Sequence, residues 1–128
     1  MKKNPLILVV EDDFSWQLNY KEILESEGYL VEVAASKDEA GRKLNKRTFE
    51  IAIIDLRLVD NDPTNRDGIE VVKLVRDLKA PTLIIVSSVH LTEEIRDQID
   101  KLGIFAFWDK SGSVQELRDL VAKAANSS

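Results

Sequence analysis

Short apolar runs alternate along the chain with longer stretches in which apolar residues recur at helical spacing. Runs of four or five mainly aliphatic residues, bounded by polar ones, are typical of strands buried on both faces of a sheet. Five runs fit this description, the last being the least apolar: Leu6–Val10, Leu30–Ala34, Ile51–Ile54, Leu83–Val86 and Phe105–Trp108. The pattern therefore predicts five strands.

Each predicted strand is followed by a stretch whose apolar residues share one helix face. Ser36 with Glu39, and Ser113 with Glu116, form the Ser-x-x-Glu pattern that begins helices, whereas Gly28 is typical of a helix end. We expect helices at residues 14–27, 37–46, 67–78, 93–102 and from 114 towards the C-terminus. Strand and helix thus alternate five times.

This strict alternation indicates a parallel sheet that is covered by helices on both faces. Five strands are too few for a closed β/α barrel, which has eight. We therefore predict an α/β fold with an open, doubly wound, five-stranded parallel sheet. Residues 1–128 are expected to form a single domain, which could be a piece of a longer protein. The connection at residues 56–67 is long for a loop between a strand and a helix.

Composition narrows the class of protein without identifying it. The net charge of −5 argues against direct binding of nucleic acid, which requires clustered Lys and Arg. No apolar run approaches the roughly 20 residues of a membrane helix, and Glu11 interrupts the first run too early for a signal peptide. We therefore expect a cytoplasmic protein that does not contact a membrane. The lack of cysteine excludes disulfides, thiolate metal sites and cysteine nucleophiles.

Polar residues stand where four of the predicted strands end. In chain order they are Glu11, Asp12 and Asp13, then Asp55, then Ser87 and Ser88, then Asp109 and Lys110. In an open parallel sheet, ligands bind beyond the carboxyl ends of the strands, so these side chains are expected to converge on one edge. The sequence therefore predicts an acidic site with one ammonium and one hydroxyl group.

The chemistry of such a cluster can be argued from its groups. Neighbouring carboxylates repel one another, and a hard cation such as Mg²⁺ relieves this while keeping sites for water and a phosphate. A carboxylate can also attack phosphorus and form an aspartyl phosphate. Taken singly, the same residues have ordinary explanations, since acids cap helices and a lone Asp or Ser often ends a strand in a turn. Their joint position at one sheet edge favours a functional site.

Five motifs follow one another in order: Leu6 to Asp12, Ile53-Ile54-Asp55-Leu56, Asp67-Gly68-Ile69-Glu70, Ile84 to Ser88, and the Gly, aromatic and Lys spacing of residues 103–110. In these motifs the chain resembles the receiver domain of bacterial response regulators over essentially its whole length. The resemblance implies a flavodoxin-like (βα)5 fold with strand order 2-1-3-4-5. It also implies Mg²⁺ as the cofactor.

The resemblance assigns roles to the acids. Asp55 would be the phosphoacceptor and, with Asp12, a direct Mg²⁺ ligand. Glu11 would act on the metal mostly through water, and the backbone carbonyl of Arg57 would be a further ligand.

Three further residues have implied roles around the phosphoryl group. Lys110 would pair with its oxygens, Ser87 would turn inward to donate a hydrogen bond to it, and Phe107 would follow by changing rotamer. Ser87 and Phe107 together would be the switch. Trp108 is out of phase with Phe107, so one of these two side chains is expected to face away from the last helix or towards a partner. Trp16 and Trp108 are expected in the core or at an interface.

The chain departs from the family pattern in a few places. Val59 stands where the family usually has Pro, and the segment from Asp55 to Gly68 is longer than usual. Ser111 replaces a Pro that is commonly cis, so a trans Lys110–Ser111 bond is expected because cis bonds are costly without Pro. Phe107 lacks the hydroxyl of the commoner Tyr.

The expected function is a phosphorylation-dependent signalling switch rather than an enzyme, because the only reaction implied is the chain's own Mg²⁺-dependent phosphorylation and dephosphorylation. A histidine kinase or a phosphotransfer protein would be the donor. The output would be altered binding of a downstream effector domain or protein through the face of the fourth helix, fifth strand and fifth helix. A second copy of the chain is a further candidate partner.

Three alternative functions compete with this one. An aspartyl phosphatase would carry a second Asp two residues after its nucleophile, where Arg57 stands. A flavin module of similar topology would need a Ser, Thr and Gly-rich phosphate loop where Glu11, Asp12 and Asp13 stand. The alternative that stays open is a degenerate receiver that binds partners without being phosphorylated.

Overall fold

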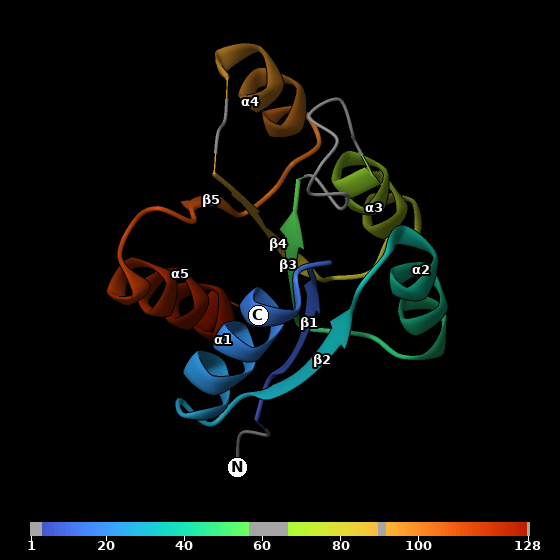
Figure 1. The fold of residues 1–128 in the computed structure, drawn as a ribbon. Coiled ribbons are helices and arrows are strands. Elements are labelled where there is room, and N and C mark those ends of the chain that lie inside the picture. Colours follow the sequence, from blue (N-terminus) through green and yellow to red (C-terminus); the bar gives the residue numbers. More distant parts are fainter. Residues whose placement is uncertain (1–3, 57–66, 90–91, 128) are drawn as a thin grey trace.

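The computed structural model describes residues 4–56, 67–89 and 92–127, and within these residues five strands form one sheet. All neighbouring strands are parallel, in the order β2-β1-β3-β4-β5, which confirms the predicted fold class (Figure 1). The strands are β1 (Leu6–Val10), β2 (Leu30–Ala34), β3 (Ile51–Asp55), β4 (Leu83–Ser88) and β5 (Ala106–Asp109). Compared with the prediction, β3 and β4 extend further towards their carboxyl ends, and β5 begins one residue later.

Five helices connect or follow these strands: α1 (Phe14–Glu25), α2 (Lys37–Lys46), α3 (Asp67–Asp77), α4 (Glu93–Asp100) and α5 (Val114–Ser127). They agree with the predicted helices to within two residues at most ends. Two helices, α1 and α4, end two residues before the predicted position. In both, the amides that follow donate to carbonyls three residues earlier and tighten the chain into a turn.

Side-chain caps fix where helices begin. Asp13 accepts a hydrogen bond from the amide of Trp16 at 2.9 Å, which directs the chain from the first acids into α1. Ser36 and Thr92 cap α2 and α4 in the same way. The chain then turns out of α4 through Gly103, whose φ of 76° lies in the left-handed region that favours glycine.

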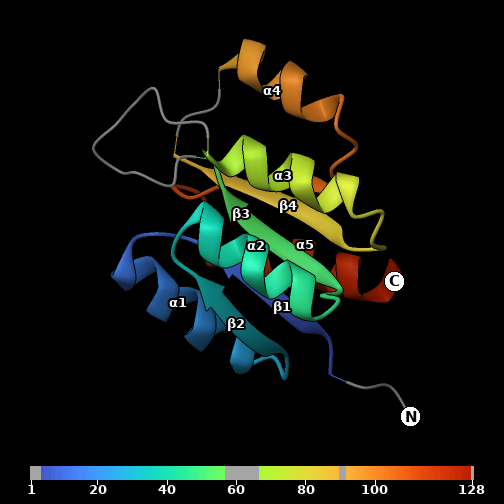
Figure 2. The same cartoon turned by 90° about the vertical axis from the view of Figure 1, so that its right-hand side faces the viewer.

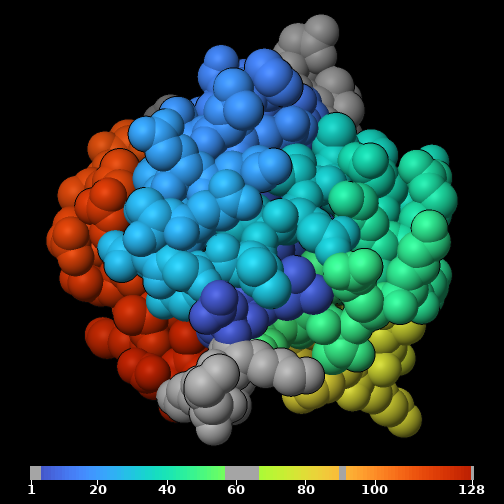
Figure 3. All heavy atoms as spheres, turned by 90° about the horizontal axis from the view of Figure 1, so that it is seen from below, coloured from blue at the N-terminus to red at the C-terminus, as the bar shows by residue number. Residues whose placement is uncertain are grey.

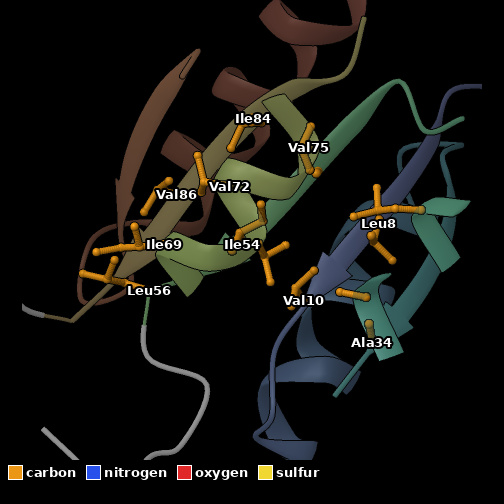
Figure 4. Close-up of a cluster of buried hydrophobic side chains, with 14 of the residues drawn as sticks. Leu8, Val10, Ala34, Ile54, Leu56, Ile69, Val72, Val75, Ile84 and Val86 are labelled. Atoms are coloured by element: carbon orange, nitrogen blue, oxygen red, sulfur yellow. The ribbon is translucent and has the colours of Figure 1, made fainter. Parts of the chain in front are cut away.

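The sheet is covered on both faces, as Figures 1 and 2 show. Because strand side chains alternate between faces, each strand contributes to two separate cores. The core towards α2 and α3, shown in Figure 4, includes Leu8, Val10, Ile54, Val72, Val75, Ile84 and Val86. The core towards α1 and α5 includes Ile7, Val9, Tyr20, Leu24, Ile53, Ile85, Trp108 and Val121. Figure 3 shows α1 at the surface between α5 and α2.

The register of the sheet places the ends of the middle strands side by side. Asp55, the last residue of β3, pairs with Ser87, and Ser87 pairs on its other side with Trp108. The expected long connection lies outside the described residues except for Leu56 and Asp67. Close to it, the amide of Gly68 donates to the carbonyl of Leu56 at 3.1 Å, so the start of α3 rests on the end of β3.

Candidate functional site

Three acids meet at the carboxyl edge of the sheet. Glu11, Asp12 and Asp55 each place a carboxylate oxygen within 4.8 Å of the other two. Glu11 is held by its amide, which donates to the carbonyl of Ala34 at 2.9 Å and continues the β1–β2 ladder. Glu11 is fully buried, Asp55 is 6% exposed, and Asp12 is half-buried. The convergence expected from the sequence therefore holds for these three acids.

Lys110 is the cation of this cluster. Its Nζ forms an ion pair with Glu11 and lies 3.4 Å from Oδ2 of Asp55. Its amide donates to the carbonyl of Ser88 at 3.0 Å, which fixes the residue to the end of β4. The ammonium also lies 4.9 Å from the centre of the Trp16 ring, a cation–π distance. Lys110 is thus buried between two carboxylates and an aromatic face.

Burial and negative charge act together on Glu11. Loss of solvent, followed by the charge of Asp55, raises the pKa of Glu11 to about 7, although Lys110 and the amide of Asp13 act in the opposite direction. The single ammonium therefore does not balance the carboxylates at this edge. A divalent cation would, and carboxylate oxygens are the ligands that Mg²⁺ and Ca²⁺ prefer. The donor set of Glu11, Asp12 and Asp55 fits a divalent-metal site.

The fourth expected metal ligand, the backbone carbonyl of Arg57, lies outside the described residues. The expected trans bond between Lys110 and Ser111 is present, since the described residues contain no cis peptide. Ser111 donates both its amide and its hydroxyl to Oδ1 of Asp109, at 2.9 and 2.6 Å, and so closes the turn that follows β5.

Ser87 and Phe107 lie on neighbouring strands but on opposite faces of the sheet. Ser87 shares the face of Ile85, towards α1 and α5, and its hydroxyl is buried without a hydrogen bond of regular geometry. Phe107 packs against the other core, away from α5, with the guanidinium of Arg96 4.8 Å from its ring centre. The two residues expected to act as a switch are therefore separated by the thickness of the sheet.

Trp16 and Trp108 belong to the core towards α1 and α5 rather than to an exposed interface. Trp108 is 1% exposed, and its ring meets that of Trp16 edge to face with centres 5.9 Å apart. Tyr20 completes the group, 6.0 Å from Trp108. No sequence motif connects Tyr20 with the site. The feature that could have linked it to the site is its position one helical turn after Trp16.

The fold and the acidic edge together define a receiver-type α/β protein, and the comparisons with known proteins agree. The sequence model of the response regulator receiver domain matches residues 7–122. The chain therefore belongs to the response regulator receiver family. Domains of this family are signalling modules rather than classical enzymes. No helix in the described part of the chain is long and apolar enough to cross a membrane.

Individual relatives span different lengths. Sporulation initiation phosphotransferase F of Bacillus subtilis is 23% identical over 94% of this chain and 93% of its own length. The chain spans only 26% and 55% of two other curated relatives, so those proteins contain further sequence.

Solved structures share the fold closely. A response regulator receiver domain protein from Methanospirillum hungatei has a TM-score of 0.86 and 25% identity, covering 98% of this chain and 96% of its own. A response regulator from Burkholderia pseudomallei, solved with a phosphorylated aspartic acid, a calcium ion and citrate, has a TM-score of 0.80 and 23% identity over 97% of this chain and 71% of its own.

Proposed function

We propose that this chain is a phosphorylation-dependent signalling switch that accepts a phosphoryl group on Asp55. The observation that carries the proposal is the position of Asp55, at the end of β3, next to two other carboxylates and 3.4 Å from the ammonium of Lys110. Family membership supports the same function. Residues 1–128 would act as a single receiver domain in the cytoplasm, as is usual for two-component signalling.

In the transfer step, a carboxylate oxygen of Asp55 forms a bond to phosphorus while the bond between phosphorus and the donor's imidazole nitrogen breaks. The nitrogen keeps the electron pair. Lys110 stays close to Asp55 and offsets the charge of the phosphoryl oxygens, and Ser87, which pairs with Asp55 in the sheet, donates a hydrogen bond to one of them. A histidine kinase or a phosphotransfer protein would supply the group.

Glu11, Asp12 and Asp55 would hold Mg²⁺, with the carbonyl of Arg57 as the further ligand that the family resemblance implies. When bound, Mg²⁺ would supply positive charge to the transferred group. The Burkholderia pseudomallei relative contains a phosphorylated aspartic acid and a calcium ion, which supports a divalent cation in such a protein.

The output surface in this proposal is the face of α4, β5 and α5. Ser88, Arg96, Phe107, Asp109 and Glu116 line a hollow of about 270 Å³ there. Phosphorylation adds a charge of roughly −2 next to Ser87. Because Ser87 and Phe107 lie on opposite faces of the sheet, the change at Ser87 would reach Phe107 through the paired backbones of β4 and β5. Another rotamer of Phe107, which lines the hollow, would then alter binding of an effector or of a second copy of this chain.

Mass spectrometry after incubation with a small phosphodonor and Mg²⁺ tests the central claim. We expect one phosphoryl group on the wild type and none on Asp55→Asn or in the presence of a chelator. Asp13→Asn is the matched control, because it makes the same chemical change at the same edge and Asn caps a helix as well as Asp does. It should be phosphorylated like the wild type.

Two other results would reject parts of the proposal. Equal modification of Asp55→Asn and the wild type would show that Asp55 is not the acceptor. If the wild type is neither modified nor able to bind Mg²⁺, the chain is a phosphorylation-independent interaction module.

A further inference from the structure

Tyr20 is a buried polar residue of α1 whose hydroxyl points towards the acidic edge. Its side chain is 1% exposed, and its ring is fixed by Trp16 and Trp108, with ring centres 5.7 and 6.0 Å away. A Tyr that only fills a core needs no hydroxyl, and a buried hydroxyl without a partner is costly. The orientation of this hydroxyl therefore calls for a functional explanation.

Ser87 is the partner that the geometry offers. The Ser87 hydroxyl interacts with the phenol of Tyr20, yet neither buried oxygen makes a hydrogen bond of regular geometry within the described part of the chain. Both residues lie in the layer between the sheet and α1, since Ser87 shares a face with Ile85 and Tyr20 packs in the same core. Two buried hydroxyls thus face each other directly beside Asp55.

The direction of the hydrogen bond follows from the surrounding charge. Burial raises the pKa of Tyr20 far above its ordinary value, and the charges of Glu11 and Asp55 raise it further. The phenol therefore keeps its proton, and the negative potential of the site attracts that proton towards Ser87. With Tyr20 as the donor, Ser87 keeps its own proton for an acceptor on its other side.

We propose that Tyr20 is a positioning residue, whose hydroxyl donates to Ser87 and thereby orients the Ser87 hydroxyl towards the phosphoryl group on Asp55. This inference rests on the proposed function. Ser is suited to the role because its hydroxyl can rotate among staggered positions without moving a methyl group, unlike that of Thr. A chain of two hydrogen bonds ending on an anion is also stronger than its separate parts, because each bond polarises the next.

The test is a double-mutant cycle with Tyr20→Phe, Ser87→Ala and the double variant. Tyr20→Phe removes only the hydroxyl and keeps the aromatic cluster, so the fold is expected to survive, which circular dichroism can verify. The measured quantity is the affinity for beryllofluoride with Mg²⁺, a phosphoryl mimic, taken from the midpoint of tryptophan fluorescence titrations. Tyr29→Phe is the matched control, since it is the same change at the only other Tyr, away from the site.

We expect Tyr20→Phe to weaken beryllofluoride binding about fivefold, the effect of one hydrogen bond. Ser87→Ala should weaken it as well, and adding Tyr20→Phe to Ser87→Ala should have no further effect. Tyr29→Phe should bind like the wild type.

Three results would overturn the inference. An unchanged or increased affinity in Tyr20→Phe would show that Tyr20 does not support Ser87, while the proposed function stands. The same loss with and without Ser87 would show that Tyr20 acts through packing alone. Failure of the wild type to bind the mimic would reject the proposed function and this inference together.

Discussion

Protonation of Glu11 links the stability of the site to pH. Its pKa is about 7 in the folded protein, against an ordinary value of 4.5, mainly because it is buried and then because Asp55 is close. Between these two pH values the folded protein holds a proton that the unfolded chain has released. The contribution of Glu11 to stability is therefore greatest below about pH 4.5 and falls as the pH rises to about 7.

Glu11→Gln should remove this pH dependence. Without metal, the wild type should lose stability between pH 5 and pH 8, whereas the variant should not. The difference in unfolding free energy between them should therefore shift by at most about 3 kcal/mol in favour of the variant over this range. Urea unfolding in the presence of a chelator measures it. Glu22→Gln, an exposed site on α1, is the control and should follow the wild type. Parallel pH profiles for wild type and Glu11→Gln would contradict the expectation.

At the scale of elements, the contact between α3 and β3 positions the phosphoacceptor. A Cβ atom on Gly68 would lie 2.1 Å from the backbone oxygen of Asp55 and 2.5 Å from that of Leu56, so only glycine fits there. The first turn of α3 therefore packs directly on the end of β3.

Gly68→Ala should push these two elements apart. We expect a loss of unfolding free energy of at least about 2 kcal/mol and a marked loss of phosphorylation of Asp55. Gly41→Ala is the control, because its Cβ would meet only the side chain of Leu74, at 3.6 Å, in the middle of α2. It should be stabilising by up to about 1 kcal/mol, since Ala favours a helix. Denaturation curves of both variants measure these stabilities. Equal stabilities would show that the close contact between Gly68 and the end of β3 does not matter.

For the whole molecule, the acidic edge should make stability depend on Mg²⁺. A ligand that binds only the folded state stabilises it by about 2.7 kcal/mol at a hundred times its Kd. We expect Mg²⁺ to raise the melting temperature of the wild type but not of Asp12→Asn, with Asp13→Asn again as the control. The increase should be larger at pH 8 than at pH 6, because Mg²⁺ competes with a proton on Glu11. A Mg²⁺ effect of equal size in Asp12→Asn would place the cation elsewhere.

Much of the fold could be predicted because its elements are local. The apolar runs predicted the five strands, and the capping residues Ser36 and Ser113 predicted helix starts to within a residue or two. The ends of helices and strands were harder to predict, because they depend on neighbouring segments rather than on the side-chain pattern. Examples are the hydrogen bonds of the turn after Glu25 and the pairing of Ser87 with Asp55.

The set of residues at the site was likewise readable, since parallel strands bring their carboxyl ends to one edge. The interactions among these residues could not be predicted from the sequence. The ion pair between Lys110 and Glu11 joins residues 99 positions apart, and no sequence pattern fixes their distance or burial. The complete burial of Glu11 against Lys110 is likewise a property of the folded chain.

By itself, the sequence determined the alternation of elements, the open parallel sheet and the acids, hydroxyl and ammonium that end its strands. Periodicity and chain order are local properties, and they suffice for this. The tertiary structure alone decided that Ser87 and Phe107 lie on opposite faces with different helices over them, and that the hydroxyl of Tyr20 reaches the site from α1. These contacts arise from the packing of helices against a sheet, which brings together residues that the sequence keeps far apart.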